Sequence, residues 1–122
     1  MAKTILIVDD SASMRCVVTM ALKGAGYDVI EGSDGKDALA KLTGQKVHLI
    51  ITDVNMPGMD GITFLKEVKQ HATYKFTPVI MLTTESDEEK KRLGQAAGAR
   101  AWVVKPFKPE QLLNAVQRMC LA

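Results

Sequence analysis

The chain has 122 residues, of which 47% are hydrophobic and 25% are charged. These proportions are typical of a globular protein and the length is that of one domain, so we expect a single folded unit over residues 1–122 without a separate output domain. Sixteen basic and fourteen acidic residues give a net charge of +2, which is too small an excess to predict a nucleic-acid partner. The apolar runs fall far short of the ~18 residues of a membrane-spanning helix, so we expect no membrane insertion.

The two cysteines, Cys16 and Cys120, lie near opposite ends of the chain and lack the spacing of a metal or redox motif. Free thiols are the economical interpretation, and they indicate a reducing compartment. The first apolar run ends at Asp9, which is too early for the apolar core of a secretory signal. We therefore expect a cytoplasmic protein that acts as a monomer.

Apolar runs and helical periods alternate along the chain. In chain order, the apolar runs predict strands at Thr4 to Val8, Tyr27 to Ile30, Leu49 to Ile51, Pro78 to Leu82 and Trp102 to Val104. The helical periods between them predict a first helix on Met14 to Ala25 that stops at Gly26, a second on Asp37 to Leu42 opened by Ser33 or Asp34, and a third on Ile62, Leu65 and Val68. A fourth helix is opened by a capping box of Ser86 and Glu89 and ends near Gly98, and a fifth runs from Pro109 to Met119. Unbroken apolar runs are typical of strands covered on both faces. The fold class predicted is therefore α/β, a doubly wound five-stranded parallel sheet with helices on both faces.

Polar residues follow four of the predicted strands. Asp9 and Asp10 follow the first, Asp53 and Asn55 the third, Thr83 the fourth and Lys105 the fifth, whereas Glu31 and Gly32, after the second, offer no obvious chemistry. Ligands of open α/β sheets bind beyond the carboxyl ends of the strands, so we expect one shared pocket. Its three carboxylates would need a neutralising cation, and oxygen ligands favour Mg²⁺. Asp53 is then a candidate nucleophile for a phosphoryl group that Lys105 and Thr83 would neutralise and position.

These residues resemble the motifs of the receiver domains of bacterial two-component response regulators. The matching segments are Ile7-Val8-Asp9-Asp10, the run from Thr52 to Gly61 around Asp53, Met81-Leu82-Thr83-Thr84-Glu85 and Val104-Lys105-Pro106-Phe107. They occur in order and at matching spacing over the whole chain. The nearest resemblance is to stand-alone chemotaxis regulators of the CheY type, and it implies a flavodoxin-like sheet with strand order 2-1-3-4-5.

The resemblance implies how the pocket works. Asp53 would be the phosphoacceptor. Mg²⁺ would be coordinated by Asp10, Asp53 and the backbone carbonyl of Asn55, and Asp9 would assist through water. Lys105 would contact the phosphoryl group.

The same resemblance implies a conformational switch. Thr83 would move toward the phosphoryl group, and Trp102 stands where the family usually has Tyr or Phe, the aromatic that swings inward as Thr83 moves. The larger indole could leave that closure incomplete, and Trp102 could equally be a half-buried aromatic of an edge strand. The Lys105–Pro106 peptide bond would be cis.

The resemblance implies a phosphorylation-activated signalling switch. A histidine kinase of the chemotaxis type would supply the phosphoryl group, and the output face, formed by the fourth helix, fifth strand and fifth helix, would bind the flagellar motor switch protein. The sequence leaves open whether a dedicated phosphatase acts on the chain. A phosphorelay intermediate or a phosphate sink would share the site chemistry and differ only in its partner.

One enzyme class uses related chemistry. Aspartyl-phosphate hydrolases of the haloacid-dehalogenase kind also place an Asp nucleophile and Mg²⁺ at a strand end, but they have a second acid two positions later that protonates the leaving group. That position is Asn55 in this chain, and an amide cannot donate such a proton. We therefore expect no multiple-turnover enzyme, only a phosphoacceptor that assists its own phosphorylation and dephosphorylation.

Overall fold

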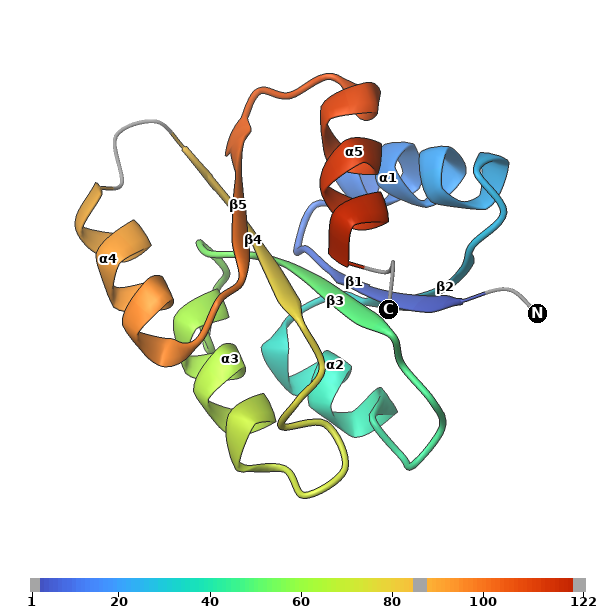
Figure 1. The fold of residues 1–122 in the computed structure, drawn as a ribbon. Helices are drawn as coiled ribbons and strands as arrows, with labels where there is room; N and C mark the ends of the chain where they lie inside the picture. Colours follow the sequence, from blue (N-terminus) through green and yellow to red (C-terminus); the bar gives the residue numbers. More distant parts are fainter. Residues whose placement is uncertain (1–2, 85–87, 120–122) are drawn as a thin grey trace.

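The computed structural model describes residues 3–84 and 88–119. Strands and helices alternate along it (Figure 1). In chain order they are β1 (Thr4–Val8), α1 (Ala12–Gly24), β2 (Asp28–Gly32), α2 (Gly35–Lys41), β3 (Leu49–Asp53), α3 (Gly61–Gln70), β4 (Val79–Thr84), α4 (Glu88–Ala97), β5 (Ala101–Lys105) and α5 (Pro109–Met119). The alternation predicted from the apolar runs is confirmed.

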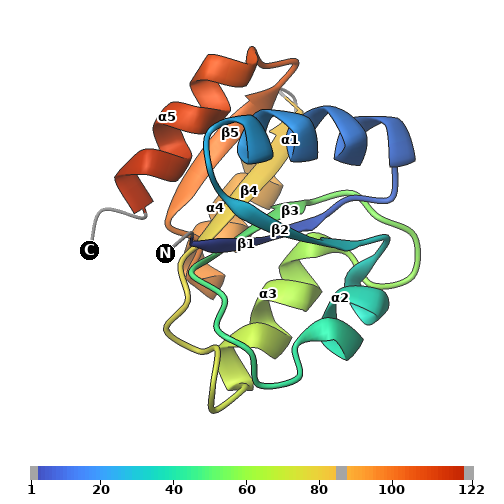
Figure 2. The ribbon, with the colours of Figure 1, turned by 90° about the vertical axis from the view of Figure 1, so that its right-hand side faces the viewer.

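The five strands form one parallel sheet in the order β2-β1-β3-β4-β5. Helices α1 and α5 lie on one face of the sheet, and α2, α3 and α4 lie on the other (Figures 1 and 2). The doubly wound α/β class and the strand order 2-1-3-4-5 are therefore confirmed. This order makes β1 and β3 neighbours at the centre of the sheet, so their carboxyl ends meet.

The hydrophobic core is divided by the sheet into two layers. In β1, Ile5 and Ile7 point into the layer under α1 and α5, and Leu6 and Val8 point into the layer under α2 and α3. All four side chains are 0% exposed. Because successive side chains of a strand point to opposite faces, a strand covered on both sides must be apolar throughout. This explains the unbroken apolar runs of the sequence.

Polar side chains fix where the first three helices begin. Ser11, Asp34 and Asp60 cap α1, α2 and α3 by accepting hydrogen bonds from backbone N–H groups three residues later, at 3.2, 2.8 and 2.8 Å. Of the two residues predicted to open the second helix, Asp34 is therefore the N-cap. The capping box predicted for the fourth helix lies partly outside the described residues, because Ser86 is not among them.

The strands run further than the apolar runs predicted. Asp53, Thr83 and Lys105 belong to the ends of β3, β4 and β5, and Glu31 and Gly32 belong to β2, so the prediction that these residues follow their strands is wrong. The parallel ladder continues into the polar residues, with Asp53 paired to Leu82 and Gly32 to Val8. Backbone hydrogen bonding, not side-chain hydrophobicity, therefore sets the strand ends.

The helices, Cys16 and the Lys105–Pro106 bond bear on three further predictions. None of the helices in the described residues has the length and apolar content needed to cross a membrane. Cys16 is an exposed free thiol on α1, whereas Cys120 lies outside the described residues. The Lys105–Pro106 peptide bond is cis, as the resemblance implied.

Candidate functional site

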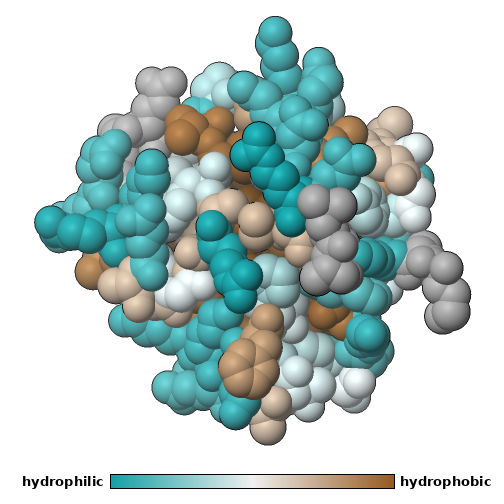
Figure 3. Space-filling model, viewed as in Figure 1, coloured by the Kyte–Doolittle hydropathy of each residue, from teal (hydrophilic) through white to brown (hydrophobic). Residues whose placement is uncertain are grey.

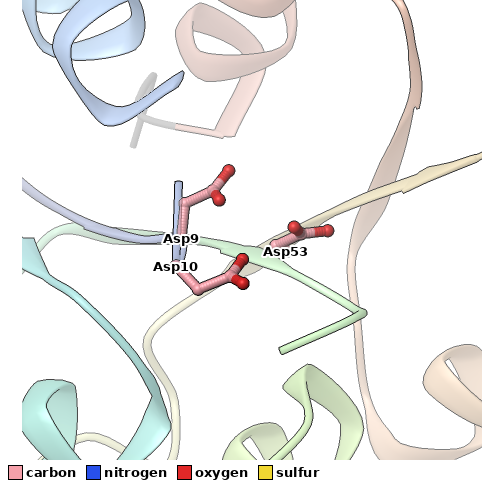
Figure 4. A group of neighbouring side chains, drawn as sticks. All are labelled: Asp9, Asp10 and Asp53. Atoms are coloured by element: carbon pink, nitrogen blue, oxygen red, sulfur yellow. The ribbon is translucent and has the colours of Figure 1, made fainter. Parts of the chain in front are cut away.

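Asp9, Asp10 and Asp53 form a carboxylate cluster at the carboxyl ends of β1 and β3 (Figure 4). One oxygen from each residue lies within 4.8 Å of the other two. The register of the two strands causes this meeting, because the pairing of β1 with β3 ends at Val8 and Thr52, and the next residues along the chain are Asp9 and Asp53. The structure thus brings together the three carboxylates that the sequence assigns to one pocket.

Asp9 is the most enclosed member of the carboxylate cluster, at 0% exposure. Its Oδ1 accepts a hydrogen bond from the backbone N–H of Ser11 at 2.9 Å. Its Oδ2 is buried and has no hydrogen-bond donor among the described residues, and the Lys105 ammonium lies 3.6 Å away. A buried carboxylate oxygen without a donor is costly, so this oxygen has unused capacity to bind a cation.

Asp53 lies at the end of β3 and is only 7% exposed. The Lys105 ammonium donates a hydrogen bond to its Oδ2 at 3.0 Å. Burial raises the pKa of the Asp53 carboxyl, the Lys105 hydrogen bond and charge lower it, and the negative charge of Asp9 raises it again. Burial prevails, so the pKa lies above its ordinary value.

The carboxylate cluster fits a hard divalent cation. All three side chains offer oxygen atoms, which Mg²⁺ prefers, and one of these oxygens is buried without a hydrogen-bond donor. Asn55 follows two residues after Asp53, and its backbone N–H also bonds to the Asp53 carboxylate. Lys105 supplies one positive charge to three carboxylates, which leaves a net negative pocket.

Thr83 and Trp102 lie on one face of the sheet. Thr83 is 2% exposed near the end of β4, and Met81, two residues earlier on that strand, pairs with Trp102 of β5. Side chains two residues apart on a strand share a face, so Thr83 and Trp102 both belong to the side covered by α4. The half-buried indole packs so closely on Gly94 of α4 that a Cβ atom there would lie 2.5 Å from the ring.

Three contributors to the site were missed by sequence reasoning. Arg15 of α1 donates to the backbone carbonyl of Asp9 at 2.5 Å and pairs with Glu31. Lys90 of α4 donates to the side-chain carbonyl of Asn55. Gly61 lets α3 approach β3, because a Cβ atom at this position would lie 2.1 Å from the Asp53 carbonyl oxygen. Only Gly61 carried a sequence signal, since it closes the motif around Asp53.

Comparison with known proteins gives the geometry a context. A family profile described as "Response regulator receiver domain" matches residues 5–117. The chain is 40% identical to the alkaline phosphatase synthesis regulatory protein PhoP of Bacillus subtilis over 92% of its own length, but it spans only 46% of that protein. It is 50% identical to the solved structure of chemotaxis protein CheY4 of Vibrio cholerae, with a TM-score of 0.92 and coverage of 98% and 99% of the two chains.

A further solved structure bears on the metal. The receiver domain of sensor histidine kinase PA1611 from Pseudomonas aeruginosa matches with a TM-score of 0.90, 26% identity and full coverage of both chains. That structure is described with a magnesium ion coordinated in its active site cleft. The present fold is therefore similar to one that holds Mg²⁺ in a cleft, and its own carboxylates offer the same kind of ligand.

Proposed function

The chain belongs to the receiver domains of response regulators, and from that premise we propose that it is a signalling switch whose Asp53 takes a phosphoryl group from a histidine kinase. The position of Asp53 carries this proposal. Its buried carboxylate lies 3.0 Å from the Lys105 ammonium and beside two further carboxylates. Asp9 is also buried and lies 3.6 Å from the Lys105 ammonium, but among the described carboxylates only Asp53 accepts a hydrogen bond from that ammonium.

The proposed transfer is an in-line displacement. One carboxylate oxygen of Asp53 forms a bond to phosphorus while the bond from phosphorus to the donor histidine nitrogen breaks, and that bonding pair leaves with the imidazole. The Lys105 ammonium, now held by Asp53 and Asp9, would turn to an equatorial oxygen of the phosphoryl group. Thr83 would donate its hydroxyl to another.

We propose that the carboxylate cluster binds Mg²⁺ as part of this chemistry. Asp10, Asp53 and the backbone carbonyl of Asn55 would hold the ion directly, and Asp9 would act through water. When bound, the ion supplies positive charge that offsets the phosphoryl oxygens. The buried Asp9 Oδ2 supports the proposal, because Lys105 approaches it only to 3.6 Å and it has no hydrogen-bond donor among the described residues.

Phosphorylation would act by shifting a population of conformations. Thr83 would move toward the phosphoryl group. The space that it leaves on the α4 side of the sheet would let the Trp102 side chain swing inward. The indole nitrogen of Trp102 is buried without a hydrogen-bond partner among the described residues, so this orientation leaves a donor unused. The changed surface of α4, β5 and α5 would then be the output face.

We infer that the output is chemotactic, with the flagellar motor switch protein as the partner and the monomer in the cytoplasm as the acting form. The 50% identity to the Vibrio cholerae chemotaxis protein supports this assignment. The match to PhoP shows that similar domains also occur in transcriptional regulators. A phosphorelay intermediate would instead pass its phosphoryl group to a second histidine domain. A phosphate sink would lose the group without gaining affinity for a motor peptide.

The protein is proposed to be a phosphoacceptor and not a phosphatase for small substrates. Asn55 occupies the position that would have to protonate a leaving group, and its side-chain carbonyl is bound by Lys90. Steady release of p-nitrophenol from p-nitrophenyl phosphate would contradict this part of the proposal.

The test of the proposed function uses acetyl phosphate and Mg²⁺. Intact-mass spectrometry of the wild-type chain should show one added phosphoryl group, and Trp102 fluorescence should change on Mg²⁺ addition and again on phosphorylation. Asp53→Asn should acquire no adduct, while Asp60→Asn, at a helix cap outside the carboxylate cluster, should still be labelled. Retained labelling in Asp53→Asn would show that the wrong nucleophile has been chosen.

A further inference from the structure

The loops between α2 and β3 and between α3 and β4 enclose a recess at the end of the sheet opposite the carboxylate cluster (Figure 1). This distal recess, lined by residues 44–48, 73, 74 and 76–78, has a volume of about 440 Å³. Phe76 lines it and is 81% exposed, the highest value among the large hydrophobic side chains that the structure describes. Figure 3 shows hydrophobic atoms over the α3–β4 loop with hydrophilic atoms beside them.

Phe76 is held on a braced loop. The Lys69 ammonium donates to the backbone carbonyls of Lys75 and Thr77, the residues on either side of Phe76, at 3.2 and 3.3 Å. Tyr74 is 1% exposed and anchors the loop from below, because its hydroxyl donates to the Gln45 carbonyl at 2.7 Å. The backbone that carries the Phe76 ring is thus held in place, which lowers the entropic cost of ordering this loop on binding.

Lysines lie in and beside the distal recess: Lys46 lines it, Lys75 lies next to Phe76, and Lys69 is bonded to the loop that carries Phe76. The chain has no Asp or Glu between Asp37 and Asp53 or between Glu67 and Glu85, the two stretches that supply both loops. Within the described residues, Lys46, Lys69, Lys75 and Arg100 form no ion pair with a carboxylate. Burial lowers the pKa of the Lys69 ammonium, and the nearby charge of Arg100 lowers it further.

The Lys75 ammonium lies 5.2 Å from the centre of the Phe76 ring, so the aromatic surface and the positive charge form one feature. We propose that the distal recess binds an acidic segment of a partner protein, with an aromatic side chain of that segment packed against Phe76. Carboxylates of the segment would pair with Lys46 and Lys75, which have no such partner in the described structure.

The shape of the site favours a peptide over a membrane or a nucleic acid. The recess is concave and has room for a few side chains, whereas a bilayer would require a broad apolar face, and Phe76 is the one large exposed hydrophobic side chain described in the two loops. The net charge of +2 is too small for general nucleic-acid binding. Because the site lies at the other end of the sheet from Asp53, its partner could stay bound in either phosphorylation state.

The test titrates the ¹⁵N-labelled full chain with a random copolymer of glutamate and tyrosine, and with polyglutamate as the charge control. The copolymer should bind at least tenfold more tightly than polyglutamate. The amide chemical shifts of the labelled chain that change on its addition should centre on residues 44–48 and 73–78. Phe76→Ser should remove this preference, and Lys46→Glu with Lys75→Glu should weaken both polymers at least tenfold. Added salt should weaken both.

Matched controls exclude general surface effects. Met20→Ser removes another exposed apolar side chain, from α1, and Lys108→Glu reverses an exposed charge three residues after Lys105, so both should leave binding unchanged. Equal binding of the two polymers, unchanged copolymer affinity in Phe76→Ser, or shifts centred elsewhere would overturn the proposal. So would tighter binding to phosphatidylglycerol vesicles or polyuridylate than to the copolymer. Labelling of Asp53 by acetyl phosphate should be the same in Phe76→Ser and wild type, which separates this site from the proposed phosphotransfer.

Discussion

At the scale of single residues, the proposed phosphoacceptor Asp53 lowers the stability of the fold. Burial raises the pKa of its carboxyl despite the hydrogen bond from Lys105, so the folded state holds this charge less favourably than the unfolded chain does. In Mg²⁺-free buffer, we expect Asp53→Asn to increase the free energy of unfolding by about 1 kcal/mol, because Asn keeps the shape and removes the charge. Urea unfolding followed by circular dichroism measures this, and a less stable variant would contradict it.

The stability gain in Asp53→Asn should also depend on pH. A carboxyl whose pKa is raised by folding destabilises the fold wherever it is ionised in the native state. As the pH falls through that raised pKa, toward the value of about 4 for an unfolded Asp, the penalty disappears. The difference between variant and wild type should therefore be largest near pH 7 and close toward about pH 4. Asp28→Asn, at an exposed position, provides the control series.

Lys105 should oppose the binding of Mg²⁺ while it supports the response to phosphorylation. Its ammonium lies 3.0 Å from Asp53 and 3.6 Å from Asp9, so it competes with a metal ion for both carboxylates. We expect Lys105→Met to bind Mg²⁺ up to about tenfold more tightly, a gain of up to about 1.4 kcal/mol. The Trp102 fluorescence change on phosphorylation should fall by at least half. Lys108→Met should change neither, and weaker Mg²⁺ binding in Lys105→Met would refute the competition.

At the scale of elements, α4 and β5 are fitted to each other through Gly94 and Trp102. A Cβ atom at Gly94 would lie 2.5 and 2.6 Å from two ring carbons of Trp102. We expect Gly94→Ala to destabilise the fold by about 1 to 3 kcal/mol, although alanine is the better helix former, because the ring and the helix must separate. Gly24→Ala, near the end of α1 with no atom within 4 Å of the added Cβ, should not destabilise.

A double-mutant cycle makes the Gly94 prediction specific. Trp102→Leu removes the ring atoms that the new Cβ would meet, so Gly94→Ala should cost less in that background than in the wild type. The difference in free energy of unfolding between the two backgrounds is the coupling between helix and strand. Equal costs in both backgrounds would show that the contact does not carry the effect.

The sequence was most informative where chemistry is local. Asp34 caps its helix through its own side chain, and the apolar run at Thr4 to Val8 reflects burial of one strand on both faces, so both could be predicted from neighbouring residues. The bond from Lys90 to Asn55 joins residues that are distant in the sequence, and the bond from Arg15 goes to a backbone carbonyl, that of Asp9. Such contacts depend on how helices dock on the sheet, and no periodicity in the chain records that.

At the scale of the whole molecule, strand order explains why the site forms. The order β2-β1-β3-β4-β5 places β1, β3, β4 and β5 side by side, and the residues of the site come from the ends of these four strands. The apolar runs predicted parallel strands but not their order, which came only from the resemblance to receiver domains. The edge strand β2 supplies no residue to the carboxylate cluster, in agreement with the lack of evident chemistry at its end.

The two core layers should unfold together, because the central strands contribute to both. Ile50 and Met81 enter the layer that contains Trp102, while Ile51 and Leu82, one residue further along the same strands, enter the other layer. We therefore expect Trp102 fluorescence and far-ultraviolet circular dichroism to give the same urea midpoint. Mg²⁺ at 100 times its Kd should shift both transitions by about 2.7 kcal/mol, because it binds only the folded carboxylate cluster. A fluorescence transition at lower urea would instead show that α4 and β5 detach before the sheet unfolds.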